Sequence, residues 1–281
     1  MTSHTIKSAL AEAHSQLEEV SDSPAFDSEI LLAHCLNKNR SYLYTWPDKH
    51  LTDEQLECFK TFIDKRKTDY PIAYLVGTKA FWTLDLIVTP DVLIPRPETE
   101  LLVEIALEKI SNIKQPQILD LGTGSGAIAL ALASERPDAI ITASDYSAEA
   151  LDIAKKNAYK HKLIKQVMFI ESDWFECIPE INYDLIVSNP PYIAPHDPHL
   201  SQTIRYEPQQ ALVAENNGMS DIETLIRDTK KHLKTDAWII IEHGYNQSEE
   251  TLSLFKEYGF AKEKTYLDIS NNPRISCAQN S

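Results

Sequence analysis

The segment SNPPYIAP, residues 188–195, places an asparagine, two prolines and a tyrosine directly after the apolar run YDLIVS. Proline fixes φ at about −65° and has no backbone N–H, so the segment is stiff and presents carbonyl oxygens with few donors. An NH₂ group on a conjugated system would be held by Asn189 Oδ1 and the carbonyl of Pro190, with Tyr192 packed flat against its plane. Taken alone, the segment is also typical of a rigid turn. With the glycine-rich loop described below, it predicts a site for an amide or nucleobase NH₂ group.

Such a site would overcome the low reactivity of an amide nitrogen. The lone pair of that nitrogen is delocalised, as the barrier of roughly 18–20 kcal/mol to peptide C–N rotation indicates. Two acceptors outside the donor plane favour a pyramidal nitrogen whose lone pair points at a methyl group, and holding both reactants in line supplies roughly 7–11 kcal/mol. The nitrogen becomes acidic only once transfer begins, so we expect no strong general base. None of His196, His199 and His243 is predicted to be one.

A glycine-rich segment, ILDLGTGSGAIAL at residues 118–130, has the pattern of a strand, a tight turn and a helix start. In this arrangement the backbone passes close to a bound nucleotide. Gly122, Gly124 and Ala127 satisfy the dinucleotide pattern GxGxxG/A. Gly122, Gly124 and Gly126 equally give GxGxG, which is common in proteins that bind S-adenosylmethionine. The loop alone leaves both cofactors open, and a purely structural turn as well.

Three carboxylates and one indole near strand ends favour S-adenosylmethionine. Asp120 lies inside the first strand, where it would face a cationic ammonium such as that of methionine. Asp145 ends the second strand and is suited to accept both ribose hydroxyls of an adenosine. Asp173 would take the adenine amino group and Trp174 would lie near the ring. Singly, Asp145 and Asp173 are also explained as caps and Trp174 as core, but ligands of such sheets bind at the carboxyl ends of successive strands.

The elements that must position these residues follow from hydrophobic periodicity. Apolar runs predict buried parallel strands, amphipathic segments predict the helices between them, and the alternation indicates a doubly wound α/β sheet. The predicted strands are 117–122, 139–145, 167–173, 183–189 and 237–244, and the predicted helices are 127–135, 148–160, 221–234 and 248–259. Segments 262–269 and 274–279 lack a helix between them, so we expect a closing antiparallel pair.

The residues before this sheet have a different pattern. Segments 3–20, 23–37 and 52–68 carry apolar residues at three- and four-residue spacing behind Ser, Thr or Asp caps, which predicts a small helical bundle. Alternating apolar residues around Thr89–Asp91 predict a β-hairpin, and Pro97 opens the next helix. We therefore expect a helical substrate-recognition domain at 1–76, a hairpin linker at 77–95 and a Rossmann-like seven-stranded methyltransferase domain at 96–281.

Composition limits the class of protein. The chain has 27 Lys and Arg against 42 Asp and Glu, a net charge of −15, and no basic stripe, so we expect no direct binding of nucleic acid through its phosphates. No signal pattern or long apolar run indicates export or a membrane span. Cys35, Cys58, Cys177 and Cys277 are scattered without metal-ligand spacing, which predicts ordinary thiols, no metal and a cytoplasmic location.

With these motifs in hand, the sequence resembles the release-factor glutamine N5-methyltransferase family of the PrmC/HemK type. The resemblance covers nearly the whole chain, through PIAYLVGTKAFW, VLIPRPETE, ILDLGTGSGAIALALA, SDWF, IVSNPPYI, DPHL, YEPQQAL and IEHG in the expected order. It implies methylation of the side-chain amide of the glutamine in the GGQ motif of class I peptide-chain release factors, with S-adenosylmethionine as cofactor. We expect a monomer.

The resemblance also assigns residues. It implies cofactor binding by Gly122, Thr123, Gly124, Ser125, Gly126, Asp145, Trp174 and Asn189, with Arg96, Glu98, Thr99 and Glu100 lining the cofactor side. It implies that Asn189, Pro190, Pro191 and Tyr192 hold the glutamine. The long segment 195–216 is typical of a lid or binding surface, and Arg205, Tyr206 and Glu207 fit either order around a substrate backbone or a plain surface loop. The segment after Ile269 matches only loosely and receives no role.

Two other functions stay open at this point. NPPY also occurs in N6-adenine methyltransferases, in which a flipped base of DNA or RNA would take the place of the amide. A non-enzymatic alternative is a binding module whose N-terminal helices recruit a partner while the cofactor fold is vestigial. The intact Asp145 and NPPY segment favour the enzyme.

Overall fold

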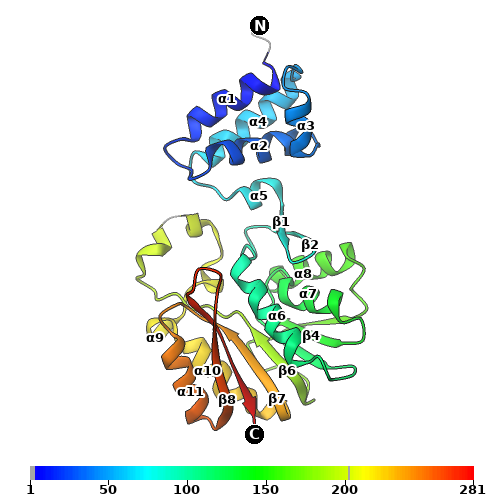
Figure 1. Cartoon of the computed structure of the whole chain (residues 1–281), viewed down its shortest axis with the longest axis vertical. Coiled ribbons are helices and arrows are strands. Elements are labelled where there is room, and N and C mark those ends of the chain that lie inside the picture. Colours follow the sequence, from blue (N-terminus) through cyan, green and yellow to red (C-terminus); the bar gives the residue numbers. More distant parts are fainter. Residues whose placement is uncertain (1–3, 202) are drawn as a thin grey trace. The chain divides into compact units, whose positions relative to one another are not determined.

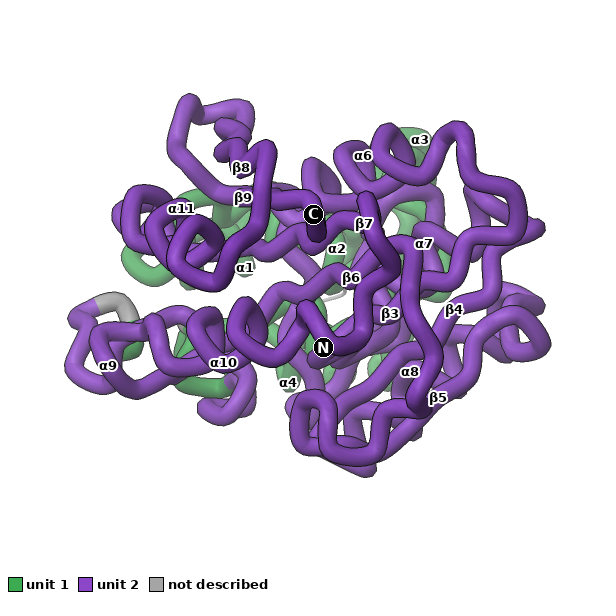
Figure 2. Tube along the Cα trace, turned by 90° about the horizontal axis from the view of Figure 1, so that it is seen from below, with its two compact units in different colours: residues 1–77, 199–206 green, residues 78–198, 207–281 purple. Residues whose placement is uncertain are grey.

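The structure is a computed structural model that describes residues 4–201 and 203–281 (Figure 1). The chain forms two compact units (Figure 2). The first contains the residues up to Gly77 together with His199–Tyr206, and the second contains Thr78–Pro198 and Glu207–Ser281. This division differs from the predicted segments in two places: the hairpin belongs to the second unit, and 199–206 belongs to the first. The chain therefore connects the two units three times.

The first unit is a helical bundle. Its helices are α1 (Ile6–Leu17), α2 (Pro24–Cys35), α3 (Arg40–Thr45), α4 (Asp53–Arg66) and α5 (Ile72–Val76). Thr5 and Thr52 begin α1 and α4 with capping boxes, in which the threonine and the residue three positions later bond each other's backbone N–H. The three helices predicted from periodicity are confirmed as α1, α2 and α4. The short helices α3 and α5 span too few residues to show periodicity.

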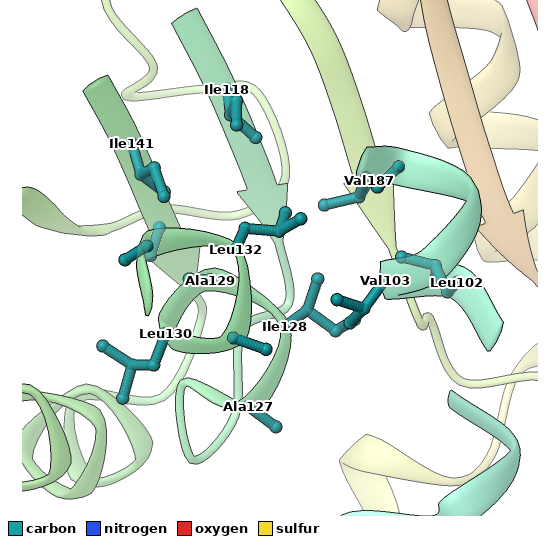
Figure 3. Packing of buried hydrophobic residues seen from close by; sticks show 14 of the residues in the cluster. Leu102, Val103, Ile118, Ala127, Ile128, Ala129, Leu130, Leu132, Ile141 and Val187 are labelled. Carbon is teal, nitrogen blue, oxygen red and sulfur yellow. The ribbon is translucent and has the colours of Figure 1, made fainter. Parts of the chain in front are cut away.

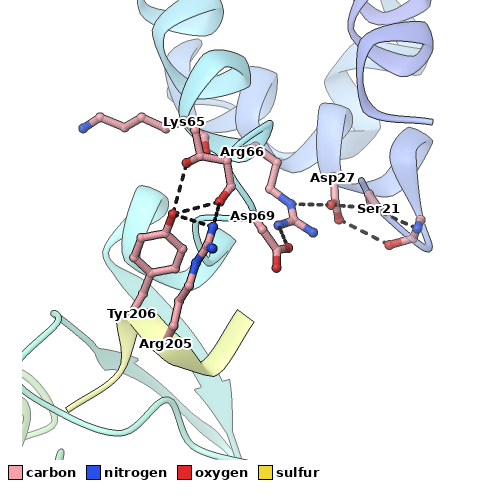
Figure 4. A network of polar contacts seen from close by, with 9 residues as sticks. Ser21, Asp27, Lys65, Arg66, Asp69, Arg205 and Tyr206 are labelled. Carbon is pink, nitrogen blue, oxygen red and sulfur yellow. Dashed lines mark hydrogen bonds and ion pairs between the residues drawn. The ribbon is translucent and has the colours of Figure 1, made fainter. Parts of the chain in front are cut away.

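A buried ion pair joins α2 and α4 (Figure 4). Arg66 Nε donates to Asp27 Oδ2 at 2.9 Å, and the two side chains are 11% and 7% exposed. Just after the end of α4, Arg205 Nη2 and the Tyr206 hydroxyl donate to the carbonyl of Thr68 at 2.6 and 2.8 Å. Arg205 and Tyr206 are thus engaged within the first unit.

The β-hairpin has its turn in a different place from the prediction. Strand β1 (Thr78–Phe81) pairs antiparallel with β2 (Leu84–Ile87), and Phe81 faces Leu84. The turn is therefore Trp82-Thr83 rather than Thr89–Asp91, and the expected turn position is wrong. Trp82 has φ of 54°, a conformation that sequence rules associate with Gly or Asn. Its backbone N–H is held by Glu100 Oε1 at 2.8 Å.

The second unit is built on a seven-stranded sheet, as predicted. The order is β5-β4-β3-β6-β7-β9-β8; the first five strands run parallel, and β9 is antiparallel to both β7 and β8. The bounds are β3 (Gln117–Leu121), β4 (Ile140–Asp145), β5 (Val167–Glu171), β6 (Tyr183–Ser188), β7 (Leu233–Glu242), β8 (Phe260–Leu267) and β9 (Pro273–Asn280). The α/β fold class and the closing antiparallel pair are confirmed.

Helices cover both faces of this sheet. The α-helices are α6 (Glu100–Lys109), α7 (Ala127–Glu135), α8 (Ala148–Lys160), α9 (Glu215–Gly218), α10 (Ser220–Thr229) and α11 (Ser248–Glu257). Short 3₁₀ turns are η1 (Pro97–Thr99), η2 (Pro198–Ser201), η3 (Thr203–Tyr206), η4 (Gln209–Ala211) and η5 (Lys230–His232). All of η3 and all of η2 except Pro198 belong to the first unit.

Each face of the sheet carries its own hydrophobic core. Alternate residues of β3 point to opposite faces: Ile118 packs with α6 and α7, while Leu119 packs with α10 and α11. Figure 3 shows Ile118, Ile141 and Val187 against Ala129 and Leu132 of α7. Both faces of the central strands are buried, which explains their continuous apolar sequence.

The four cysteines are free thiols, and Cys35 and Cys58 lie side by side with their Sγ atoms 2.6 Å apart. Burial raises the pKa of the Cys35 thiol. Among the described residues, no helix combines the length and the apolar character that crossing a membrane requires.

Candidate active site

A cavity of about 310 Å³ opens at the carboxyl ends of the parallel strands in the second unit. This is the edge at which open α/β sheets bind ligands. The volume lies within the range of roughly 300–1,000 Å³ typical of small-molecule sites. Of the residues predicted from the sequence, Gly122, Gly124, Asp145, Asp173, Trp174, Asn189 and Pro191 line it. Asp120, Thr123, Ser125, Gly126, Pro190 and Tyr192 are not among its lining residues.

The glycine-rich loop forms one wall. Gly122, Gly124 and Gly126 have φ of 71°, 56° and 85°, which non-glycine residues rarely adopt. A Cβ on Gly124 would meet no atom within 4 Å, so the missing side chain leaves open space beside the cavity. The Gly124 N–H donates to Asp145 Oδ2 at 2.8 Å, which fixes the loop against the end of β4.

Two carboxylates line the cavity: Asp145 at the end of β4 and Asp173 just after β5. Asp145 also accepts from the Ser147 N–H through Oδ1 at 2.9 Å. Burial raises the pKa of Asp145, and the N–H groups of Ser147 and Gly124 oppose that rise. Asp173 follows β5, next to Trp174, and both line the cavity. Asp145 thus lies at the same edge of the sheet as Asp173 and Trp174, although it follows a different strand.

Asp120 has a different environment from the one expected. Its side chain is 0% exposed, and Oδ2 accepts from Thr123 Oγ1 at 2.6 Å and from the Ala129 N–H at 3.2 Å. Burial raises the pKa of Asp120 to about 7. These bonds join β3 to the glycine loop and to α7, so the observed contacts of Asp120 hold the loop in place.

The NPPY segment begins at the end of β6, on the opposite wall. Asn189 and Pro191 face the cavity, while Pro190 is buried. Asn189 Nδ2 donates to Thr99 Oγ1 at 3.2 Å, which leaves Oδ1 as the acceptor available to a ligand. The Tyr192 hydroxyl donates to Glu242 Oε1 at 3.3 Å. Burial raises the pKa of Tyr192 well above its usual range.

The backbone of the segment is held tightly after Tyr192. Gln247 Nε2 donates to the Tyr192 carbonyl at 3.0 Å, and Ile193 pairs with residues 212–214 through two backbone bonds. Gly218 has φ of 86°, and a Cβ there would lie 2.1 Å from the Tyr192 carbonyl oxygen. Only glycine allows this approach, and nothing in its sequence context indicates the role.

The PRPETE segment, residues 95–100, supports the site from outside the cavity. Arg96 Nη2 donates to Glu207 Oε1 at 2.5 Å, and Glu207 Oε2 accepts from the Ile94 N–H at 3.0 Å. Glu207 therefore anchors the segment that follows η3. Thr99 Oγ1 accepts a hydrogen bond from Asn189 Nδ2, and Glu100 Oε1 accepts one from the Trp82 N–H. None of Arg96, Glu98, Thr99 and Glu100 lines the cavity.

Sequence reasoning missed the remaining cavity residues. They are Asp91, Val92, Leu93, Ser144, Tyr146, Ser147, Ala150, Ser172, Pro208, Gln210, Ala211 and Asp221. Burial raises the pKa of Asp221, and a hydrogen bond from Trp174 opposes that rise. Pro208, Gln210 and Ala211 belong to the YEPQQAL motif, so that motif was the available signal. No motif in the sequence indicated Asp221, which lies on α10.

Comparisons with known proteins agree with this site. Residues 8–77 match the PrmC N-terminal domain, and residues 97–218 match the methyltransferase small domain. The release factor glutamine methyltransferase of Aliivibrio fischeri is 47% identical over 263 residues, which are 93% of this chain and 92% of that protein. The chain belongs to the release factor glutamine methyltransferase family. The protein of that name from Escherichia coli is 44% identical over 269 residues, or 95% of this chain and 96% of that protein.

Membership of the release factor glutamine methyltransferase family confirms the resemblance predicted from the motifs. It also confirms the prediction that the chain is a methyltransferase. Solved structures add support for the fold alone. A methyltransferase from Pyrococcus furiosus has a TM-score of 0.54 and 16% identity, covering 72% of this chain and 92% of that chain. The 16S rRNA N2 G1207 methyltransferase RsmC of T. thermophilus has a TM-score of 0.55 and 18% identity, covering 73% and 50%.

Proposed function

We propose that this chain transfers a methyl group from S-adenosylmethionine to the side-chain amide nitrogen, N5, of the glutamine in the GGQ motif of class I peptide-chain release factors. One observation carries the proposal: Asn189, with its NH₂ committed to Thr99, lines the same cavity as Asp145, Asp173 and Trp174. The names of the related proteins support the substrate.

The residues present fit S-adenosylmethionine. Gly124 leaves room for a ligand beside Asp145, which retains lone pairs to accept ribose hydroxyls. Asp173 and Trp174 would take the adenine amino group and ring. When bound, S-adenosylmethionine supplies an electrophilic methyl group on a positively charged sulfur. We assign Asp120 to holding the glycine loop through Thr123, with its Oδ1 free of any hydrogen-bond partner in the described part of the chain.

The NPPY segment would prepare the amide. Asn189 Oδ1 and the Pro190 carbonyl accept the two amide hydrogens, and Tyr192 and Pro191 limit movement of the amide plane. Acceptors outside that plane weaken the conjugation which otherwise occupies the nitrogen lone pair. The amide proton becomes acidic as transfer proceeds and then leaves to water, so the chain needs no strong base. Consistent with this, His243 is fully buried between Gly244 and Ser276.

A labelled-methyl assay tests the function. The purified chain is incubated with methyl-labelled S-adenosylmethionine and a class I release factor, and then with the same factor carrying Gln→Ala in GGQ. We expect label in the first factor and none in the second. Equal label in both would reject the glutamine as acceptor, and salt-sensitive transfer to DNA or RNA would favour adenine methylation instead.

The partners and location follow from this substrate. Because release factors act in translation, we propose a cytoplasmic enzyme that works as a monomer and contacts no membrane. Sedimentation of the purified chain alone and with a release factor tests the oligomeric state. A stable dimer of the free chain would contradict the proposed monomer.

A further inference from the structure

Trp174 has a backbone conformation that a bulky residue rarely adopts. Its φ is 43°, in the left-handed region, and the residue lines the cavity. Residues in this region persist only where the surrounding structure holds them, and such positions cluster at ligand-binding sites. The contacts that hold Trp174 in this conformation therefore bear directly on the shape of the cavity.

The side chain of Ser172 joins the two ends of the turn that contains Trp174. Ser172 directly follows β5 and is 5% exposed. Its Oγ donates to the Trp174 carbonyl at 3.0 Å and accepts from the Cys177 N–H at 3.0 Å. Its backbone N–H donates to the Asp145 carbonyl at 3.0 Å, which fixes the start of the turn against the end of β4. A serine hydroxyl has one hydrogen to donate, so that of Ser172 is used within the turn.

The bond to the Trp174 carbonyl also sets the direction of the indole. Rotation about the N–Cα bond, which φ measures, turns the carbonyl group and the side chain of a residue together. Because the Ser172 hydroxyl holds the carbonyl in place, it also holds the Cβ of Trp174. A return of Trp174 to a negative φ would move the carbonyl off this hydroxyl and turn the side chain away from its present position.

The indole joins the hydrophobic core to the glycine-rich loop. Trp174 packs against the core on the sheet face that α10 and α11 cover. A Cβ on Gly122 would lie 3.6 and 3.8 Å from Cζ3 and Cη2 of Trp174, so the six-membered ring lies against the first glycine of the loop. Phe175 adds a second anchor to the turn, because it stacks on the ring of His232 in η5 with the ring centroids 4.7 Å apart. The indole is therefore a fixed part of the cavity wall beside the glycine-rich loop.

We propose that Ser172 is a positioning residue for cofactor binding: its hydroxyl holds Trp174 in the left-handed conformation, in which the indole offers a flat apolar surface to the adenine ring of S-adenosylmethionine. This inference rests on the proposed function and deepens it. Although Ser172 also lines the cavity, it acts through Trp174, because its hydroxyl is used within the turn. Stacking of a base depends on the placement of the aromatic ring, so a turn without this hydroxyl should bind the cofactor less tightly.

Two substitutions at Ser172 and one control test the role. Ser172→Ala removes the hydroxyl, and Ser172→Thr keeps it. Ser28→Ala is the matched control: Ser28 is 1% exposed, and its hydroxyl donates to the Pro24 carbonyl at 2.6 Å within α2. The control deletes a similarly buried serine hydroxyl in the first unit, outside the cavity.

We expect Ser172→Ala to weaken the binding of S-adenosylmethionine, measured by calorimetry, by roughly 10-fold. The KM for the cofactor should rise to a similar extent. In contrast, kcat at saturating cofactor should stay within about threefold of the wild type, because the adenine ring is remote from the methyl group within the cofactor. Ser172→Thr should bind within about threefold of the wild type, and Ser28→Ala should be unchanged. Unchanged affinity in Ser172→Ala, or a loss of kcat as large as the loss of affinity, would overturn the proposal.

A double-mutant cycle distinguishes action through Trp174 from a direct contact between Ser172 and the cofactor. Trp174→Ala removes the indole, so adding Ser172→Ala to it should change the affinity by less than about twofold. If Ser172→Ala weakens binding equally in the wild type and in Trp174→Ala, Ser172 does not act through the indole, and the positioning role is refuted.

Binding and methylation are separate readouts, so the two proposals can fail separately. If Ser172→Ala weakens cofactor binding as expected but the wild type methylates no release factor, the proposed function fails and the role of Ser172 stands. If the wild type methylates the factor but Ser172→Ala binds the cofactor normally, the proposed function stands and this inference fails. A wild-type chain that binds no S-adenosylmethionine would overturn both.

Discussion

Replacing Glu242 by Gln should stabilise the folded protein at alkaline pH relative to the wild type. Burial, opposed by the bonds from Thr99 and Tyr192, raises the pKa of Glu242 from 4.5 to about 7. A difference of this size corresponds to about 3 kcal/mol between the two protonation states. Gln cannot ionise, so residue 242 adds no pH dependence to the free energy of unfolding of the variant.

The sign follows from the protons bound by each state. Between pH 4.5 and about 7 the folded wild type keeps a proton on Glu242 that the unfolded chain has lost. The free energy of unfolding of the wild type therefore falls as pH rises through this window and stays lower above it. Asp120 titrates in a similar window, but it is present in both proteins and cancels in their difference.

The assay is urea unfolding of wild type and Glu242→Gln at about pH 5 and about pH 8.5, followed by the fluorescence of the second unit. The variant should gain about 2–3 kcal/mol relative to wild type between these two values. Glu104→Gln, at an exposed position of α6, is the matched control, and its effect should stay within about 0.5 kcal/mol at both. A difference that does not vary with pH, or that favours the wild type at high pH, would refute the reasoning.

Three further outcomes follow from the same contacts. Gly218→Ala should reduce kcat by at least about tenfold, because its methyl group would overlap the Tyr192 carbonyl; normal kinetics would show that the NPPY backbone tolerates displacement. Asp145→Asn should weaken cofactor binding in calorimetry by roughly 10-fold or more, and unchanged affinity would remove Asp145 from the site. Arg66→Leu leaves Asp27 buried without its charged partner, so the first unit should lose about 3 kcal/mol in thermal unfolding, whereas an unaltered transition would show that the pair contributes nothing.

Much of the second unit was predictable because its signals are local. Helices 127–135 and 148–160 were predicted with the bounds that α7 and α8 have. The strand ends are visible in the sequence as polar residues after apolar runs, which is why Asp145, Asp173 and Asn189 could be assigned to one edge of the sheet from the sequence alone.

What could not be predicted depends on contacts between distant parts of the chain. Trp82 lies in the hairpin turn with a positive φ, which its residue type does not indicate. Glu100 accepts a hydrogen bond from its backbone N–H. Gly218 closely approaches Tyr192, which lies far from it in the sequence. Glu242 ends a strand without any motif that marks it as the acceptor of the Tyr192 hydroxyl.

Asp120 shows the limit of an argument from residue type alone. Its position two residues before the first glycine indicated a ligand, but side chains alternate along a strand. Asp120 shares the face of Ile118, which is covered by α6 and α7. The acid is therefore bonded to the start of α7 rather than exposed to the cavity.

The most direct test of the account is the single-turnover rate of methyl transfer by Asn189→Ala with saturating S-adenosylmethionine and release factor. Loss of an acceptor that prepares the amide should lower this rate by roughly 10²- to 10³-fold, while the stability of the fold remains close to that of the wild type. A rate equal to that of the wild type would contradict the claim that the NPPY segment activates the glutamine amide.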